Sequence, residues 1–239
     1  MRRRRGVFVT GTDTGIGKTV AACALLHALR REGIRAVGMK PVAAGCEMAA
    51  GVLQNDDALA LARASAFAPD PDLLNPYRFA EPIAPHLAAR DAGVRIDIAV
   101  IEQAFDALSA QSDFVVVEGA GGLLVPLGPN LSFADLAKTL GLPVVVVVGL
   151  RLGCLNHAML TVEVLQRRGL PAAGWIANQV DAHMLRRDDN IEALKERVPL
   201  PFLGMIPYLV GAGPERCHDV LDPAPLKSWF TQHGPAPHS

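Results

Sequence analysis

Residues 7–19 read VFVTGTDTGIGKT, and this stretch decides the fold. A short β-type run leads into a glycine loop that ends in Gly-Lys-Thr, and a segment with helical periodicity follows. This is the context of a phosphate-binding loop, although five residues, where the common pattern has four, separate the outer glycines Gly11 and Gly17. The stretch therefore predicts a nucleotide site at the end of the first strand.

Each part of the loop has an expected task at the nucleotide. Backbone N–H groups around Gly15 to Lys18, and the positive end of the following helix, would surround the phosphates. Lys18 would reach the outer phosphates, and the Thr19 hydroxyl would hold Mg²⁺. The alternative is a glycine turn without a ligand, which the order of strand, loop, Lys and Thr disfavours.

Short apolar runs alternate with segments of helical periodicity along the chain. We expect buried parallel strands at 7–11, 36–42, 114–119, 144–149, 174–178 and 202–207, and helices at 18–31, 56–66, 96–109, 133–140, 156–168 and 185–197. This alternation predicts an α/β fold in three layers, a mostly parallel sheet flanked by helices on both faces. Ligands should bind beyond the carboxyl ends of its strands.

Residues 67–95 break the alternation. Five prolines fall within this stretch, so regular structure is not expected to persist through it: Pro69, Pro71, Pro76, Pro82 and Pro85. A long ordered loop in a compact domain is usually functional, and we expect that here. The rest of residues 1–239 should form one domain, with a solvated basic tail at 1–5 and a frayed end at about 232–239.

Composition limits the possible partners. Half of the 239 residues are apolar, enough for a full core. A net charge of −1 provides no general attraction to nucleic acid or anionic lipid, so neither partner is expected. The longest apolar runs, such as 143–150, are much shorter than the roughly 20 residues of a membrane span. The cysteines lie far apart, which favours a reducing cytoplasm over a zinc cluster or disulfide framework: Cys23, Cys46, Cys154 and Cys217.

Three acidic residues are candidates for the metal that such a nucleotide site needs. Glu118 ends an apolar run in DFVVVEGAGG (113–122), and the glycines after it would let the backbone approach a phosphate or substrate closely. Asp56 and Asp57 lie near a helix start, where they could supply a second carboxylate or simply cap the helix. On the residues alone this pair stays undecided.

Two further segments have possible roles that depend on their neighbours. Lys40 ends the strand in GMKPV (38–42); if this strand lies beside the first, Lys40 faces the same phosphates as Lys18. Asn156 lies at an expected helix start, in GCLN (153–156), where free amides could bind an anion such as a carboxylate. Simple capping by Asn156 is an equal alternative.

Six segments now stand in order: GTDTGIGKT (11–19), GMKPVAAG (38–45), NDDALAL (55–61), VEGAGG (117–122), LGCLNHAMLT (152–161) and GWIAN (174–178). Together they resemble the dethiobiotin synthetase family over residues 7 to about 208, and the loop with one extra residue is that family's own form. The resemblance implies an ATP- and Mg²⁺-dependent ligase with the fold of the P-loop nucleoside triphosphatases. Its reaction is the carboxylation of 7,8-diaminononanoate with CO₂ and closure of the cyclic urea dethiobiotin in biotin synthesis, with ADP and phosphate as the other products.

The resemblance also implies the chemical steps. One amine of the substrate captures CO₂ as a carbamate, and the carbamate oxygen receives the γ-phosphoryl group of ATP. The second amine then attacks the mixed anhydride and expels phosphate. ATP is needed because a carbamate is a poor electrophile until its oxygen becomes a leaving group.

Site roles follow from the same resemblance. Lys40 and Lys18 are the implied catalytic residues, and Mg²⁺ is implied at Thr19, Asp57 and Glu118. The implied nucleotide-binding residues are Gly15, Ile16, Gly17, Lys18, Thr19, Val20, Asp57, Glu118, Gly119, Ala120, Gly121, Asn178, Gln179, Pro207, Tyr208, Leu209 and Glu215, among which Asn178 and 207–209 would meet the base and Glu215 the ribose. The implied substrate-binding residues are Thr14, Lys40, Ala44, Gly153, Cys154, Leu155 and Asn156.

The family is implied to be homodimeric, with the substrate carboxylate at the helix start that the second subunit contributes. One departure concerns Ala44, where relatives commonly carry a hydroxyl residue, so a side-chain hydrogen bond to substrate is missing or replaced. The main competing hypothesis is an ATP-driven switch of the chromosome-partition or division-site type, whose loop generally carries an additional early lysine that residues 12–15 do not have. A ligase with a glutaminase domain would not fit this length.

Overall fold

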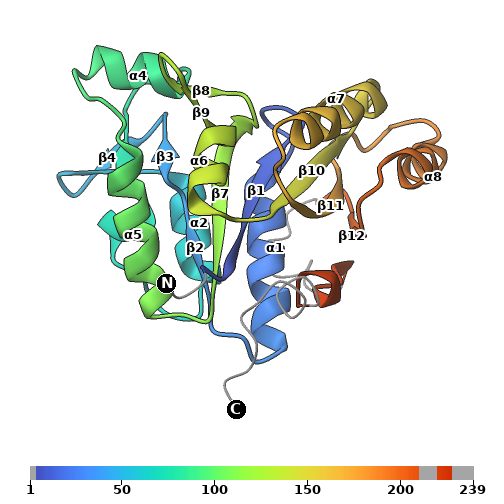
Figure 1. The fold of residues 1–239 in the computed structure, drawn as a ribbon, viewed down its shortest axis with the longest axis horizontal. Coiled ribbons are helices and arrows are strands. Elements are labelled where there is room, and N and C mark those ends of the chain that lie inside the picture. Colours follow the sequence, from blue (N-terminus) through green and yellow to red (C-terminus); the bar gives the residue numbers. More distant parts are fainter. Residues whose placement is uncertain (1–3, 210–219, 228–239) are drawn as a thin grey trace.

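The central feature of the fold is a six-stranded parallel sheet with the order β12-β11-β10-β1-β7-β2 (Figure 1). It is seen in a computed structural model that describes residues 4–209 and 220–227. The strands are β1 (Gly6–Gly11), β2 (Ala36–Met39), β7 (Phe114–Gly122), β10 (Val144–Leu150), β11 (Ala172–Gln179) and β12 (Phe202–Ile206). All six expected strands are confirmed, with ends that shift by a few residues.

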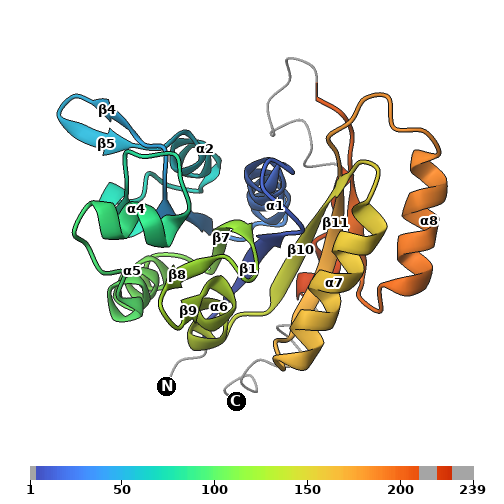
Figure 2. The same cartoon turned by 90° about the horizontal axis from the view of Figure 1, so that it is seen from above.

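Alternating side chains along the strands build one apolar core on each face of the sheet. Val7 and Val9 belong to the cluster that includes the buried side chains of α1 (Lys18–Arg31) and α2 (Asp56–Ala64). Phe8, between them, belongs to the opposite cluster, which includes side chains of α5 (Ile98–Ala110), α6 (Phe133–Leu140), α7 (Cys154–Arg167) and α8 (Arg187–Arg197). Figure 2 shows these helices on the two sides of the sheet, so the expected three-layer α/β fold is confirmed.

Several short elements were not expected from the sequence. They are the hairpin of β4 (Glu47–Ala49) and β5 (Val52–Gln54), the pair β8 (Pro126–Gly128) and β9 (Leu131–Ser132), and the parallel pair β3 (Val42–Ala43) and β6 (Tyr77–Arg78). The proline-rich stretch also contains α3 (Pro71–Leu74) and α4 (Pro85–Asp91). Both helices begin with a proline, which is tolerated in a first turn because its missing N–H has no helical partner there. As expected, regular structure does not persist through 67–95, which holds only these two short helices and the two residues of β6 with irregular chain between them.

The outer edge of β2 is covered by the chain that follows α2. The amide of Ala66 donates to the carbonyl of Ala36 at 2.8 Å, and the amide of Gly38 donates to the Ser65 hydroxyl at 2.9 Å. The amide of Lys40 donates to the carbonyl of Leu74 at 2.7 Å. These bonds satisfy alternate residues of an edge strand whose backbone groups would otherwise be open.

Arg4 and Arg5 are held against the fold, which corrects part of the expected basic tail. Arg4 donates to the Asp106 carboxylate at 2.8 and 2.9 Å and to Glu102 at 2.9 Å, and the Arg5 carbonyl accepts from the amide of Val115 at 3.0 Å. Arg4 therefore links the start of β1 to α5. The expectations for residues 1–3 and for the end at 232–239 lie outside the described residues.

The sequence predicted neither a membrane span nor a disulfide framework. None of the helices in 4–209 and 220–227 has both the length and the apolar character needed to cross a bilayer. Cys23, Cys46 and Cys154 are buried, and Cys217 lies outside the described residues.

Candidate active site

The glycine loop lies between β1 and α1 at the carboxyl edge of the sheet. Gly15 and Gly17 have φ of 72° and 76°, a left-handed conformation that favours glycine. Asn178, at the end of β11, donates from Nδ2 to the carbonyl of Ile16 at 2.8 Å. A Cβ atom on Gly17 would lie 2.1 Å from that Asn178 nitrogen, so only glycine fits between the loop and β11.

Lys18 folds back over the loop. Its Nζ donates to the carbonyl of Asp13 at 3.0 Å, and the side chain is buried. Burial lowers the pKa of Lys18, and the positive charge of nearby Lys40 lowers it further. Arg151, directly after β10, forms an ion pair with the Asp13 side chain. This pair was not predicted, although the sequence places the cation Arg151 directly after an expected strand.

Four side chains meet beside the loop: Thr19, Lys40, Asp57 and Glu118, here called the carboxylate cluster. Glu118 accepts through Oε1 from the Thr19 hydroxyl at 2.9 Å and from Lys40 Nζ at 2.7 Å. Lys40 Nζ also donates to Asp57 Oδ2 at 2.8 Å. The structure therefore brings the expected catalytic lysine into direct contact with the two expected metal carboxylates.

The order of the strands that carry these residues differs from the order considered for Lys40. We expected Lys40 to face the loop if β2 lay beside β1, but β7 lies between the two strands. That arrangement was wrong, because chain order does not determine sheet order. Glu118 on β7 is instead the middle residue, which contacts Thr19 of α1 on one side and Lys40 after β2 on the other.

The electrostatics of the carboxylate cluster keep Lys40 charged. Lys40 and Glu118 are only 3% and 1% exposed, so burial disfavours charge on both. For Lys40 the negative charges of Glu118 and Asp57 outweigh burial and hold its pKa above the usual value. Burial raises the pKa of Glu118, and Lys40 offsets part of this. For Asp57 the effect of Lys40 outweighs partial burial, so its pKa lies below the usual value.

The open question about Asp57 is answered by Asn55. The Asn55 side chain caps α2 by accepting from the amide of Ala58 at 3.3 Å, while Asp56 is exposed. The Asp57 carboxylate is therefore free to point toward Lys40. The capping alternative for Asp57 is not supported.

The cluster has the chemistry of a Mg²⁺ site. Thr19, Asp57 and Glu118 offer hard oxygen donors, which Mg²⁺ prefers. Glu118 Oε2 is buried and has no hydrogen-bond partner among the described residues, so this carboxylate keeps one unsatisfied acceptor. Within 4–209 and 220–227, no group of three His, Cys, Asp or Glu side chains is placed to hold a metal ion.

The glycines after Glu118 pack closely against neighbouring side chains, a role that the sequence did not indicate. A Cβ on Gly119 would lie 3.1 Å from the Phe8 ring, and one on Gly121, where φ is 63°, would lie 2.8 Å from Val125. Ala120 packs against the core formed with α5 to α8. Close packing inside the protein therefore explains why residue 119 is a glycine.

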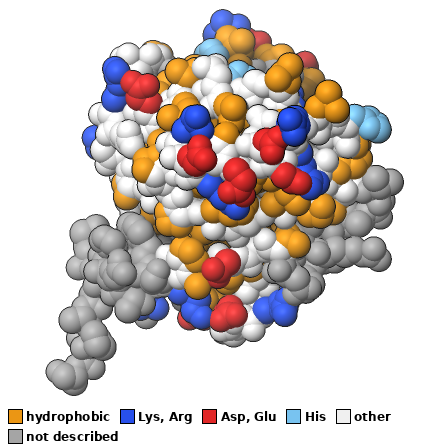
Figure 3. All heavy atoms as spheres, turned by 90° about the vertical axis from the view of Figure 1, so that its right-hand side faces the viewer, with side chains coloured by type: hydrophobic (Ala, Val, Ile, Leu, Met, Phe, Trp, Pro, Cys, Tyr) orange, Lys and Arg blue, Asp and Glu red, His pale blue; other side chains and the backbone are white. Residues whose placement is uncertain are grey.

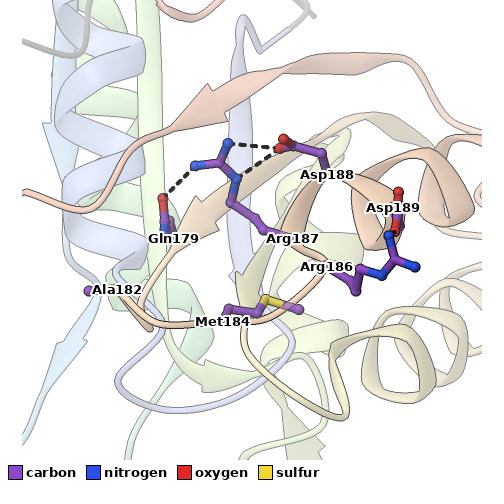
Figure 4. A pocket seen from close by; sticks show the side chains of 7 residues that line it. All are labelled: Gln179, Ala182, Met184, Arg186, Arg187, Asp188 and Asp189. Atoms are coloured by element: carbon purple, nitrogen blue, oxygen red, sulfur yellow. Dashed lines mark hydrogen bonds and ion pairs between the residues drawn. The ribbon is translucent and has the colours of Figure 1, made fainter.

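The expected base-binding residues lie at the ends of β11 and β12. Asn178 pairs in register with Ile206, so the 207–209 segment continues beside it, with Tyr208 partly exposed. Gln179 lines a neighbouring hollow of about 410 Å³ at the start of α8, where it accepts from Arg187 at 3.1 Å (Figure 4). Glu215, the expected ribose contact, lies outside the described residues.

The expected substrate residues lie on three segments. Thr14 is exposed on the glycine loop, and Ala44 is half-buried after β3. The helix α7 begins at Cys154 with Gly153 as its N-cap, so Asn156 lies inside the first turn, exposed, and the capping alternative fails. Leu152, beside this turn, is 97% exposed. Figure 3 views the neighbouring side of the molecule, where acidic and basic side chains are interspersed.

Comparisons with known proteins place the chain among relatives. A family profile described as an AAA domain matches residues 5–216. The "ATP-dependent dethiobiotin synthetase BioD" of Aromatoleum aromaticum is 57% identical over 90% of this chain and 95% of its own length. A protein of the same name from Xanthomonas axonopodis is 54% identical over 86% of this chain and 92% of its own. "ATP-dependent dethiobiotin synthetase BioD 1" of Salmonella typhi is 48% identical over 92% of this chain and 97% of its own length.

Solved structures confirm the fold alone. The MinD cell division protein of Aquifex aeolicus matches with a TM-score of 0.55 at 14% identity and covers 98% of this chain and 100% of its own. A ParA family ATPase of Chlorobium tepidum matches with a TM-score of 0.54 at 16% identity, and the match covers 99% of this chain and 94% of the ATPase. The architecture is therefore that of the P-loop nucleoside triphosphatases, as expected. At these identities the likeness gives no support to the switch hypothesis.

Proposed function

Because this chain belongs to the ATP-dependent dethiobiotin synthetase family, we propose that it carboxylates 7,8-diaminononanoate and closes the cyclic urea with ATP and CO₂. The observation that carries the proposal is the carboxylate cluster beside the glycine loop. It combines a buried cation with two carboxylates where a triphosphate would end. We propose in addition that the protein is a cytoplasmic homodimer.

Nucleotide binding is the first task of the site. The loop amides from Gly15 to Lys18 would take the phosphates, with Lys18 exchanging the Asp13 carbonyl for a phosphate oxygen. Asn178 and the 207–209 segment, which follows its strand neighbour Ile206, would hold the base. Mg²⁺ at Thr19, Asp57 and Glu118 would neutralise charge on the outer phosphates.

Phosphoryl transfer is the step in which Lys40 acts. The carbamate formed from one substrate amine and CO₂ brings a further negative charge against the γ-phosphate. Lys40 stays protonated through its contacts with Glu118 and Asp57, and it stabilises the charge that builds up between carbamate and phosphate. The second amine then attacks the carbamoyl carbon, loses its proton and expels phosphate.

Substrate positioning is proposed to involve the partner subunit. The Cys154 amide donates to the carbonyl of Arg151 at 3.0 Å, whereas the amides of Leu155 and Asn156 lack helical partners and lie at the positive end of α7, which suits a carboxylate. Asn156 and Leu152 are exposed at this turn, which leaves it open to a second copy. Ala44 contributes no hydroxyl, so we propose that the Thr14 hydroxyl takes more of the substrate contact.

The test of the function is product formation. Purified protein with ATP, Mg²⁺, bicarbonate and the diamine should form the cyclic urea, detected by mass spectrometry, and ADP release should require both diamine and bicarbonate. Equal ATP hydrolysis with and without diamine would refute the proposal.

Complementation between subunits tests the shared site. Lys40→Ala and Asn156→Leu each disable the site to which they contribute, so each homodimer should be inactive. In a random mixture of the two proteins, half the dimers are mixed, and each mixed dimer holds one intact site. The expected recovery is therefore about a quarter of wild-type turnover. Recovery of none, in a mixture shown by mass spectrometry to contain mixed dimers, would mean that Asn156 acts within its own subunit.

A further inference from the structure

A buried asparagine in the proline-rich stretch holds the backbone of Lys40. Asn75 is 2% exposed, and its Nδ2 donates to the carbonyl of Lys40 at 2.6 Å and to the carbonyl of Tyr77 at 3.1 Å. The neighbouring Leu74 carbonyl accepts from the amide of Lys40 at 2.7 Å. Both backbone groups of Lys40 are therefore bonded to two consecutive residues of another segment.

The contact continues along the chain. The amide of Tyr77 donates to the carbonyl of Pro41 at 3.2 Å, and the amide of Phe79 donates to the carbonyl of Ala43 at 2.9 Å, as part of the β3–β6 pair. Lys40 lies at the point where this small pair meets the main sheet. Because the main-sheet pairing of β2 with β7 ends at Met39, the backbone at Lys40 depends on 74–75 for its position.

A buried asparagine at position 75 destabilises the folded state unless its hydrogen bonds compensate. Its Oδ1 is buried without a hydrogen-bond partner among the described residues. A buried acceptor without a partner destabilises the folded state, so an apolar residue would be preferred if the position served packing alone. The two donors of the amide are what this side chain supplies.

We propose that Asn75 is a positioning residue for Lys40, and that the proline-rich stretch serves catalysis by fixing the backbone from which the lysine side chain extends. The inference rests on the proposed role of Lys40 in phosphoryl transfer. A displacement of about 1 Å at a reacting group can cost roughly 100-fold in rate, so partial loosening should be visible in turnover.

The experiment compares Asn75→Ala with Tyr77→Phe. The Tyr77 hydroxyl accepts from the Asp97 amide at 2.9 Å, so its removal loosens the same segment without touching Lys40. Asn75→Ala should lower kcat about 10- to 30-fold with KM for ATP changed less than about threefold, whereas Tyr77→Phe should keep kcat within about twofold. In a Lys40→Gln background, Asn75→Ala should have no further effect on kcat, because the two residues act through one group.

Hydrogen exchange keeps this inference separate from the proposed function. Peptides covering 37–43 should exchange faster in Asn75→Ala than in wild type, and at the wild-type rate in Tyr77→Phe. If wild-type protein makes no cyclic urea, the proposed function fails while exchange still reports whether Asn75 anchors Lys40. Wild-type kcat in folded Asn75→Ala, or an equal further loss in the Lys40→Gln background, would overturn the positioning role. If Asn75→Ala does not fold, Asn75→Ser takes its place in the same comparison.

Discussion

Replacing Lys40 with alanine is expected to lower the turnover of ring closure by about 100- to 1,000-fold, the loss typical when one group that stabilises transition-state charge is removed. The reason is position and charge. Lys40 is 3% exposed, stays charged through Glu118 and Asp57, and donates to the same Glu118 oxygen as Thr19. The measurement is steady-state formation of the cyclic urea, with ATP affinity from calorimetry in parallel.

ATP affinity should change much less than turnover, because the glycine loop and Lys18 remain in place. The matched control is Lys195→Ala, which removes an exposed lysine paired with Glu192 and should leave turnover unchanged. Loss of Lys40 leaves Glu118 buried without its counter-ion, which can cost about 3–5 kcal/mol of stability. Lys40→Gln is therefore measured as well, since its amide keeps a donor near Glu118. Wild-type turnover in either folded variant would contradict the catalytic role.

A single added methyl group at Gly17 is expected to weaken ATP binding by about 100-fold or more, or about 2.7 kcal/mol. In the Gly17→Ala variant the new Cβ would lie 2.1 Å from Asn178 Nδ2, and the φ of 76° is unfavourable for alanine. Relief of the clash would move the loop amides away from the phosphates or push Asn178 away from the base. Calorimetric titration with ATP and Mg²⁺ measures the loss.

Gly33→Ala separates the clash from the backbone strain. Gly33 has the same φ of 76°, but a Cβ there would meet no atom within 4 Å. This control should cost about 1–2 kcal/mol of stability and leave ATP affinity unchanged. If the two variants lost ATP affinity equally, contact between Gly17 and Asn178 would not be the cause.

The parts of this fold that the sequence predicted are those encoded locally. Runs such as 144–148, which consists of five buried valines, indicate strands without any knowledge of their neighbours. The glycine loop was equally visible, because its motif is contiguous. The short hairpin at 47–54 was missed, since its strands are only three residues long.

The parts that the sequence did not predict depend on distant contacts. Nothing near Lys40 indicates that β7 would come between β1 and β2, so the role of Glu118 in linking Thr19 to Lys40 could not be derived from spacing. Asn75 precedes a proline and has the sequence signature of an ordinary turn. Its function depends on a carbonyl 35 residues earlier in the chain.

The bonds along the outer edge of β2 have a consequence for engineering this protein. Backbone hydrogen bonds join Ala66 to Ala36 and Leu74 to Lys40. The chain between 66 and 74 is therefore fixed at both ends to residues that lie four apart on β2 and its continuation. Its length is therefore set by the sheet, even though it resembles a tolerant surface loop. A peptide tag or linker belongs instead at the exposed Ala50–Gly51 hairpin tip, where extra residues leave the reacting groups undisturbed.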